Sequence, residues 1–297
     1  MARRRVSNYN ILGHYTYFVP TAGDIVLLVV WFLVGAVAGS LISAILALCI
    51  GQDAGMEAVQ LVSYPIMFIP PMIFASSRSR RDCMTERGVK LDSSNFAPST
   101  GLGCALIAMV LTLAGSFCAD SLSSLLPPMP KWLEDALTSL TGGSFWMDFL
   151  CVSIFAPFFE EWLCRGMVLR GLLGHKVKPV WAIVISALFF AFIHLNPWQA
   201  IPAFLLGCAM GYVYYKTGSL RLTMLMHFTN NSFALVMGHI DSLKDMDSYR
   251  ELFPGPEYWL ILAGCVLLTA LSVMFYSKIK LLKPQGNCDE VPPIFES

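Results

Sequence analysis

Long apolar runs separated by short polar connections dominate the chain. The hydrocarbon core of a bilayer is about 30 Å thick, so one helical crossing takes roughly 20 mostly apolar residues. Backbone groups in lipid must be hydrogen-bonded within their own segment, and these runs are too long and too uniformly apolar for barrel strands. The pattern therefore predicts an all-α polytopic membrane protein with about eight transmembrane helices, at residues 25–50, 58–76, 101–126, 145–169, 179–195, 200–215, 220–238 and 258–277.

Two features refine this plan. Pro65, Pro70 and Pro71 predict a kink in the second span, because proline removes a backbone donor and clashes with the preceding turn. Residues 127–144 carry apolar side chains at helical spacing after a proline cluster, which predicts an amphipathic helix at the membrane interface. We expect one integral membrane domain with an N-terminal three-span region (1–143), a core (144–238) and a last span with its tail (239–297).

Composition supports the membrane interpretation. The chain has 56% hydrophobic and only 13% charged residues, outside the usual range of soluble domains. Its formal net charge is zero, so bulk charge says nothing about an acidic or nucleic-acid partner. From the apolar composition we expect the lipid bilayer as a partner and no nucleic acid. Its 9 cysteines include no C-x-x-C pair, which predicts reduced thiols and neither a disulfide framework nor a zinc knuckle.

The positions of lysine and arginine predict the orientation. If the arginines at 3–5 are cytoplasmic and eight spans alternate, nearly all basic residues fall on the cytoplasmic side. The exceptions are Lys131, Lys244 and Arg250. The first apolar run is too long for a cleaved signal peptide and reads as a membrane anchor. We therefore expect a multi-pass protein with both termini in the cytoplasm, in a bacterial inner membrane or a eukaryotic endoplasmic reticulum membrane.

Charged residues interrupt the predicted fourth span, in the stretch FAPFFEEWLCRG. Such groups cost several kcal/mol in lipid and persist mainly where they pair, line a wet cavity or perform chemistry. Glu161 and Arg165 lie at i and i+4 in the favourable order for an ion pair. Glu160 points about 100° away around the helix and has no local cation. We therefore interpret Glu161 and Arg165 as structural and Glu160 as available for chemistry.

Two later spans carry similar features. Phe190 and His194 share one helix face, and His227 and Asn231 share another. Membrane polar residues often only join helices, and that interpretation is preferred for Asn230. Phe190 is interpreted as a cavity wall more readily than as plain packing. Polar groups on three successive charge-poor helices favour a functional site over inter-helix hydrogen bonds alone.

This set of side chains is chemically complete for hydrolysis of an amide by water. A carboxylate in a low-dielectric cavity can serve as general base, while a neighbouring imidazole orients the water. Histidine and asparagine can donate hydrogen bonds to the developing oxyanion, each worth about 3 to 4 kcal/mol. The enzyme would need no nucleophile of its own.

The three motifs resemble those of the CAAX protease and bacteriocin-processing family of intramembrane endopeptidases. They read E-E-x-x-x-R at 160–165, F-x-x-x-H at 190–194 and H-x-x-x-N at 227–231, with YYKTGSL before the last. The matched region covers about 144–238, and the eight-helix plan is similar to that of the Ras-converting prenyl-protein proteases. The region 1–143 carries none of the motifs.

The resemblance implies an intramembrane catalytic cavity enclosed by the helices. Glu160 would be the catalytic base, and His194 would orient the water. His227 and Asn231 would stabilise the oxyanion, and Glu161 and Arg165 would support the base. The implied substrates are membrane-associated proteins or peptides, with prenylated C-A-A-X proteins as one precedent.

We expect no cofactor. Glu160, His194 and His227 could bind zinc with an open fourth position. The chain has no H-E-x-x-H, however, and the sequence identifies no partner for the second nitrogen of either histidine. Serine and aspartate intramembrane protease motifs, G-x-S-G and G-x-G-D, are also missing from the sequence.

Two other functions stay open from the sequence. The same Glu160, His194 and His227 could relay protons or ions in a transporter or channel, which would need access to both faces. A non-catalytic immunity or scaffold protein could also keep the fold. Straight spans would place His194 near the outer side and Glu160 and His227 nearer the cytoplasm. The catalytic hypothesis therefore predicts that the connection at 195–199 dips into the bilayer.

Overall fold

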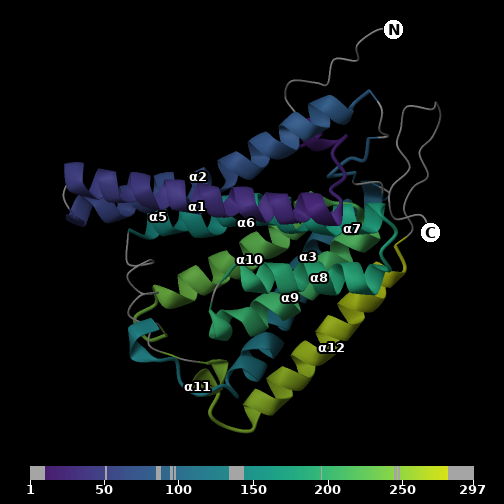
Figure 1. Ribbon diagram of the computed structural model, residues 1–297. Coiled ribbons are helices and arrows are strands. Elements are labelled where there is room, and N and C mark those ends of the chain that lie inside the picture. Colours follow the sequence, from purple (N-terminus) through teal and green to yellow (C-terminus); the bar gives the residue numbers. More distant parts are fainter. Residues whose placement is uncertain are drawn as a thin grey trace.

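The computed structural model describes residues 11–50, 52–84, 88–93, 96, 98–133, 144–194, 196–243, 246 and 248–279. Throughout these residues the regular structure is helical and includes no strand, which confirms the all-α prediction. Figure 1 shows the arrangement of the helices. They are η1 (Ile11–Tyr15), α1 (Ala22–Ile50), α2 (Gln52–Asp82), α3 (Pro98–Ser123), α8 (Pro179–Phe192), α9 (Pro197–Thr217), α10 (Leu220–Gly238), α11 (Tyr249–Leu252) and α12 (Glu257–Ser277), together with the segments of the motif helix given below.

The motif helix, which carries the glutamate pair, is one continuous helix of changing pitch. It consists of α5 (Phe145–Asp148), the π-helical η2 (Phe149–Phe155), α6 (Ala156–Glu161), the π-helical η3 (Trp162–Leu169) and α7 (Arg170–Gly174). In η2 the Ala156 N–H donates to the Cys151 carbonyl, five residues back. In the same register the Val152 carbonyl would face Pro157, which has no N–H. The helix therefore leaves an acceptor at Val152 for another element.

The helices coincide with the predicted spans to within a few residues. Three of them, α1, α3 and α12, are long and apolar enough to cross a membrane. Helix α8 is apolar but has only 14 residues, so it reaches about 21 Å and is shorter than the roughly 30 Å core. Membrane-spanning helices are thus supported at both ends of the chain. The full set of eight crossings stays a prediction.

The short α8 bears on the predicted dip after His194. Leu195 lies outside the described residues, but Asn196 is buried. Its side-chain oxygen accepts the backbone N–H of Trp198 at 3.0 Å and so caps α9. The Trp198 indole N–H donates to the Pro127 carbonyl at 2.8 Å. A helix too short for the bilayer followed by a buried cap is compatible with a connection inside the membrane. The dip itself stays a prediction.

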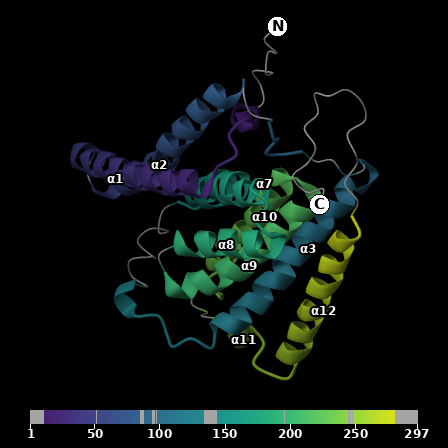
Figure 2. The ribbon, with the colours of Figure 1, turned by 45° about the vertical axis from the view of Figure 1, so that its right-hand side comes forward.

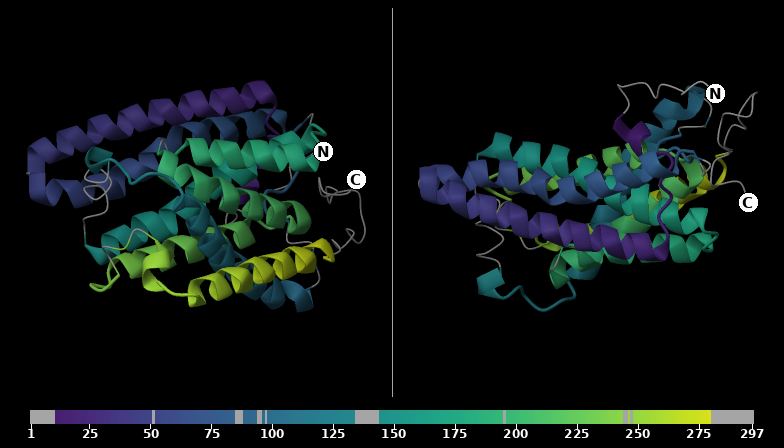
Figure 3. Two further views of the ribbon diagram at one scale, coloured as in Figure 1. Left: turned by 90° about the horizontal axis from the view of Figure 1, so that it is seen from below. Right: turned by 45° about the horizontal axis from the view of Figure 1, so that its top comes forward.

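Helices α1 and α2 form a long antiparallel hairpin along one side of the bundle (Figures 1 and 3). Figure 1 shows α2 changing direction along its length, as its three internal prolines predict. The two helices approach closely at Gly35 and Gly39. A Cβ at Gly35 would clash with the Met67 carbonyl, and one at Gly39 would lie 3.0 Å from the Ser63 carbonyl. The G-A-V-A-G stretch therefore packs as a GxxxG motif.

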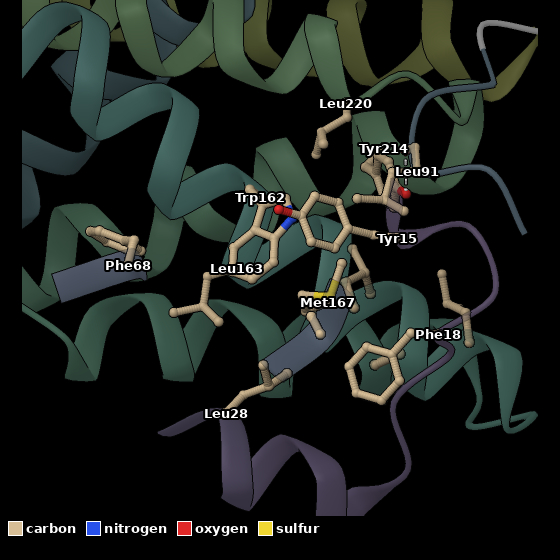
Figure 4. Close-up of a cluster of buried hydrophobic side chains, with 14 residues drawn as sticks. Tyr15, Phe18, Leu28, Phe68, Leu91, Trp162, Leu163, Met167, Tyr214 and Leu220 are labelled. Carbon is tan, nitrogen blue, oxygen red and sulfur yellow. Dashed lines mark hydrogen bonds between the residues drawn. The ribbon is translucent and has the colours of Figure 1, made fainter. Parts of the chain in front are cut away.

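The remaining helices form a bundle beside the hairpin. Helix α9 packs between α8 and α3, and α12 runs along α3 (Figure 2). Figure 4 shows Trp162, Leu163 and Met167 of the motif helix in one buried cluster with Tyr15 and Phe18. Many large apolar side chains of α1 and α12 are exposed on the outside of the bundle, as expected for helices that contact lipid.

The ends of several helices gather at one end of the bundle. The start of α1, the end of α7, the start of α8 and the end of α12 lie there together (Figures 1 and 3). Buried Arg170 joins the motif helix to the segment before α1 and to the connection after α2 by donating to the carbonyls of Gly166 at 2.7 Å, of Val89 at 2.6 Å and of Phe18. The predicted alternation of the eight spans across the membrane requires these helix ends to lie on the same side. The cytoplasmic orientation stays a prediction, and most of the predicted interfacial helix at 127–144 lies outside the described residues.

Candidate active site

Glu161 is the centre of a buried charged network. One of its carboxylate oxygens, Oε1, accepts from Arg165 Nη1 at 2.6 Å and from His227 Nδ1 at 3.2 Å. The side chains of Glu161 and Arg165 are fully buried, and that of His227 nearly so. The predicted ion pair is confirmed. It also reaches α10, so the first motif and the third are joined directly.

Arg165 connects the first motif to the second. Its Nη2 donates to the Gly207 carbonyl at 3.0 Å, and its guanidinium carbon lies 4.6 Å from the centroid of the Phe190 ring. The second contact is a cation–π interaction in a desolvated setting. A Cβ at Gly207 would lie 3.1 Å from the Ala187 Cβ and 3.4 Å from Arg165 Nη2. Gly207 therefore makes room for the arginine, a role that sequence reasoning missed because only the packing of α8 on α9 reveals it.

Phe190 lies between the two histidines. Its ring centroid is 4.9 Å from that of His194 and 5.4 Å from that of His227, both in edge-to-face geometry. It is 3% exposed, so it contacts the polar groups without facing solvent. The second and third motifs are thus brought together through an aromatic spacer. Its interpretation as a cavity wall stays a prediction.

Both histidines use the Nδ1 nitrogen for orientation. His194 Nδ1 lies 2.7 Å from the Phe190 carbonyl, and His227 Nδ1 faces the Glu161 carboxylate. Because carbonyl and carboxylate oxygens only accept, both Nδ1 atoms carry hydrogen. In the neutral ring Nε2 is then an acceptor.

Metal-binding histidines usually have such partners, which the sequence could not identify. Even so, the described residues contain no group of three or more His, Cys, Asp or Glu side chains arranged to hold a metal ion. The expectation of no cofactor stays a prediction.

Glu160 points toward α2 instead. The hydroxyl of Tyr64 donates a short hydrogen bond to Glu160 Oε1. The other oxygen, Oε2, is buried and has no hydrogen-bond partner among the described residues. Sequence reasoning missed Tyr64, whose only signal is a phenol within an apolar, proline-rich span, where a hydroxyl needs a partner.

Asn231 fills the gap that Pro157 leaves in the motif helix. Its Nδ2 donates to the Val152 carbonyl at 2.8 Å, and its Oδ1 accepts from Asn230 Nδ2 at 3.1 Å. Asn230 Oδ1 in turn accepts from Ser116 Oγ at 3.1 Å. This chain of hydrogen bonds runs from α3 through α10 to η2. It fixes the Asn231 amide and agrees with the inter-helix role expected for Asn230.

The two glutamates face different neighbours. Glu161 faces α10, and its partner Arg165 extends the network to α9, whereas Glu160 faces α2, in agreement with their predicted angular separation. Among the described residues no direct hydrogen bond joins Glu160 to His194 or to His227. Their convergence on a hydrated pocket stays a prediction, as do the individual catalytic roles.

The described residues form apolar helices, and Glu161, Arg165 and His227 meet in a buried network among them, as in membrane proteins with a polar site between their helices. Residues 142–233 match the family model described as type II CAAX prenyl endopeptidase, Rce1-like. The matched region includes every motif residue and is similar to this family of CAAX proteases. Three of the described helices are long and apolar enough to cross a membrane, which makes the chain an integral membrane protein. Neither a curated protein nor a solved structure matches the chain.

Proposed function

We propose that the protein is an intramembrane endopeptidase that hydrolyses a peptide bond of a membrane-associated protein or peptide with water activated by Glu160. The observation that carries the proposal is the coincidence of the family match with the buried network. Within it, Glu161 is paired with the Arg165 cation, while among the described residues Glu160 has a neutral phenol and no ion pair. No specific observation favours proton or ion transport by the same groups.

In the proposed reaction Glu160 Oε2 takes a proton from water, and the oxygen of that water adds to the scissile carbonyl carbon. The remaining O–H of the water donates a hydrogen bond to His194 Nε2 and stays intact, because the Nδ1 of that ring is held by the Phe190 carbonyl. When the tetrahedral intermediate breaks its C–N bond, Glu160 returns the proton to the leaving nitrogen. The carboxylate is restored, and a carboxylic acid and an amine are released.

The oxyanion of that intermediate would be stabilised by Asn231 and His227. One N–H of the Asn231 amide is committed to the Val152 carbonyl, which leaves the second for the substrate. His227 Nδ1 is committed to Glu161, so Nε2 donates only when the ring carries a proton on both nitrogens. Removing one such donor typically costs about 10²- to 10³-fold in kcat.

The proposed substrate class, prenylated C-A-A-X proteins or peptides, follows from the family description, which names type II CAAX prenyl endopeptidases. A prenyl chain partitions into lipid and would bring a peptide terminus to a site buried in the membrane. A suitable probe is an internally quenched farnesylated peptide ending in a C-A-A-X sequence, offered to the protein in liposomes.

The decisive experiment compares Glu160→Gln with the wild type on this probe, with products identified by mass spectrometry. Glutamine keeps the size of the side chain and an acceptor for Tyr64 but cannot take a proton from water. We expect cleavage to fall by about 10²- to 10⁴-fold, the usual contribution of a general base. The control is Glu257→Gln, at an exposed carboxylate that caps a turn at Gly255 with a 2.9 Å hydrogen bond. Equal cleavage by wild type and Glu160→Gln would refute the assignment.

A second measurement addresses the natural substrate. Protein termini in membranes that contain the wild type or Glu160→Gln would be compared by mass spectrometry. We expect a small set of termini to depend on Glu160. Identical sets of termini would argue against endopeptidase activity in that membrane.

A further inference from the structure

We propose that the α1–α2 hairpin is part of the catalytic apparatus, with Tyr64 as a positioning residue that holds the Glu160 carboxylate. This inference rests on the proposed function. It gives a role to a region that lies outside the family match at 142–233 and carries none of the three motifs.

The Glu160 carboxylate can rotate unless a partner holds it. The terminal torsion of a glutamate is soft and lacks sharp rotamer wells. Glu161 is held by two donors, whereas the one described hydrogen-bond donor to Glu160 is the Tyr64 hydroxyl on Oε1. Oε2 is the oxygen left for a water molecule. The phenol therefore determines which oxygen serves as the base and where it points.

Contacts between aromatic rings hold Tyr64 against the motif helix. One turn further along α2, Phe68 stacks on Phe159 with ring centroids 5.0 Å apart and planes 16° from parallel. The Tyr64 ring lies 5.6 Å from that of Phe68. Phe159 immediately precedes Glu160 in the chain. The hydrogen bond and the ring stack thus join two adjacent turns of α2 to the same turn of α6.

Two glycines of α1 support this part of α2 on the side away from the motif helix. Gly35 and Gly39 of α1 lie against the backbone of Met67 and Ser63, on either side of Tyr64 in the sequence. Without a side chain at these glycines, α1 can press directly on α2. A methyl group at Gly35 would have to displace a backbone carbonyl. Close packing of the hairpin therefore fixes the position of the phenol relative to Glu160.

The main test is Tyr64→Phe, which keeps the ring and removes the hydroxyl. We expect kcat on the farnesylated peptide to fall by about 10- to 100-fold, since misplacement of a catalytic group by 1 Å can cost about 10²-fold. KM should stay within about twofold, because the hydroxyl acts through Glu160 and not on the substrate.

The matched control is Tyr276→Phe. That buried phenol donates to the Cys104 carbonyl at 2.6 Å, so its loss removes the same chemical group between two other helices. Tyr276→Phe should keep the wild-type kcat. Equal kcat values for Tyr64→Phe and Tyr276→Phe would overturn the inference.

The role of the hairpin is tested by Gly35→Ala, with Gly264→Ala as control because a Cβ at Gly264 meets nothing within 4 Å. Gly35→Ala should lower kcat in the wild-type background and have little further effect in the Tyr64→Phe background. If the fold-losses in kcat of the two single variants multiply in the double variant, α1 acts by another route, and the path through Tyr64 is refuted.

Failure of the proposed function is separable from failure of this inference. If the wild type cleaves no prenylated peptide, the proposed function is refuted, and the Tyr64–Glu160 contact is judged by thermal unfolding alone. Tyr64→Phe, Glu160→Ala and the double variant form a cycle for that purpose. Non-additive shifts in Tm support the coupling between hairpin and motif helix, and additive shifts overturn it.

Discussion

Glu160 and Glu161 are neighbours in the chain, yet their carboxylates find different partners on the two sides of the motif helix. On the side of α9 and α10, Glu161 is neutralised by Arg165 and His227 in a fully buried network. On the side of α2, the Glu160 carboxylate has a neutral phenol as its described donor. Each carboxylate has a second oxygen without a described partner, so the two differ in whether a cation balances their charge. Residue type alone therefore does not separate a structural carboxylate from a reactive one.

The largest effect on stability should come from breaking the Glu161 side. Arg165→Leu leaves a buried carboxylate without its cation, and loss of one partner of a buried pair typically costs about 3–5 kcal/mol. Unfolding in detergent, followed by heat or denaturant, measures it. The control is Arg221→Leu, which breaks an ion pair with Asp92 in which the arginine side chain is 75% exposed, and it should cost at most about 1 kcal/mol. Similar losses in both variants would show that the Glu161 network contributes little.

Removing both charges sharpens the comparison. In Glu161→Gln/Arg165→Leu no lone buried charge remains, so the double variant should recover about 1–3 kcal/mol relative to Arg165→Leu. Glu161→Gln/Arg165→Leu should not cleave the farnesylated peptide, because His227 has lost its anionic partner. A double variant no more stable than Arg165→Leu would contradict the pairing.

A smaller effect is expected where Asn231 supports the motif helix. Asn231→Asp has the same shape but cannot donate to the Val152 carbonyl, so it should destabilise the protein by about 1–3 kcal/mol. Ser116→Ala, at the far end of the same chain of hydrogen bonds, leaves this bond in place and should cost less. Thermal unfolding of the two variants compares them directly, and a larger loss for Ser116→Ala would be inconsistent with this geometry.

The smallest effect on stability belongs to the Glu160 side. Tyr64→Phe removes one hydrogen bond and keeps the ring contacts, so it should lower the unfolding free energy by about 1 kcal/mol while lowering kcat strongly. The ratio of activity loss to stability loss is the quantity to compare with Arg165→Leu. If Tyr64→Phe unfolds as readily as Arg165→Leu, the distinction between the two sides fails.

Much of this protein could be predicted from its sequence because the physics is local. Long apolar runs in lipid have to be helical, and the described helices coincide with the predicted spans. Glu161 and Arg165 pair because i and i+4 positions meet on any α-helix, whatever surrounds them. The separation of Glu160 from Glu161 follows from the same helical geometry. The three motifs, read in order, also pointed to the family that the match at 142–233 supports.

Other contacts were decided only by the tertiary structure. Tyr64 and Glu160 are 96 positions apart, and Asn231 and Val152 are 79 apart. Which face of α2 meets α6 depends on the glycines of α1 and the stacking of Phe68, and hydrophobic periodicity is uninformative when nearly every position of a span is apolar. Similarly, the Val152 carbonyl needs a donor from another helix because the π-helical register places it opposite Pro157, which has no N–H. Chain-local rules thus determined the helices and one ion pair, whereas packing determined which partner each polar group found.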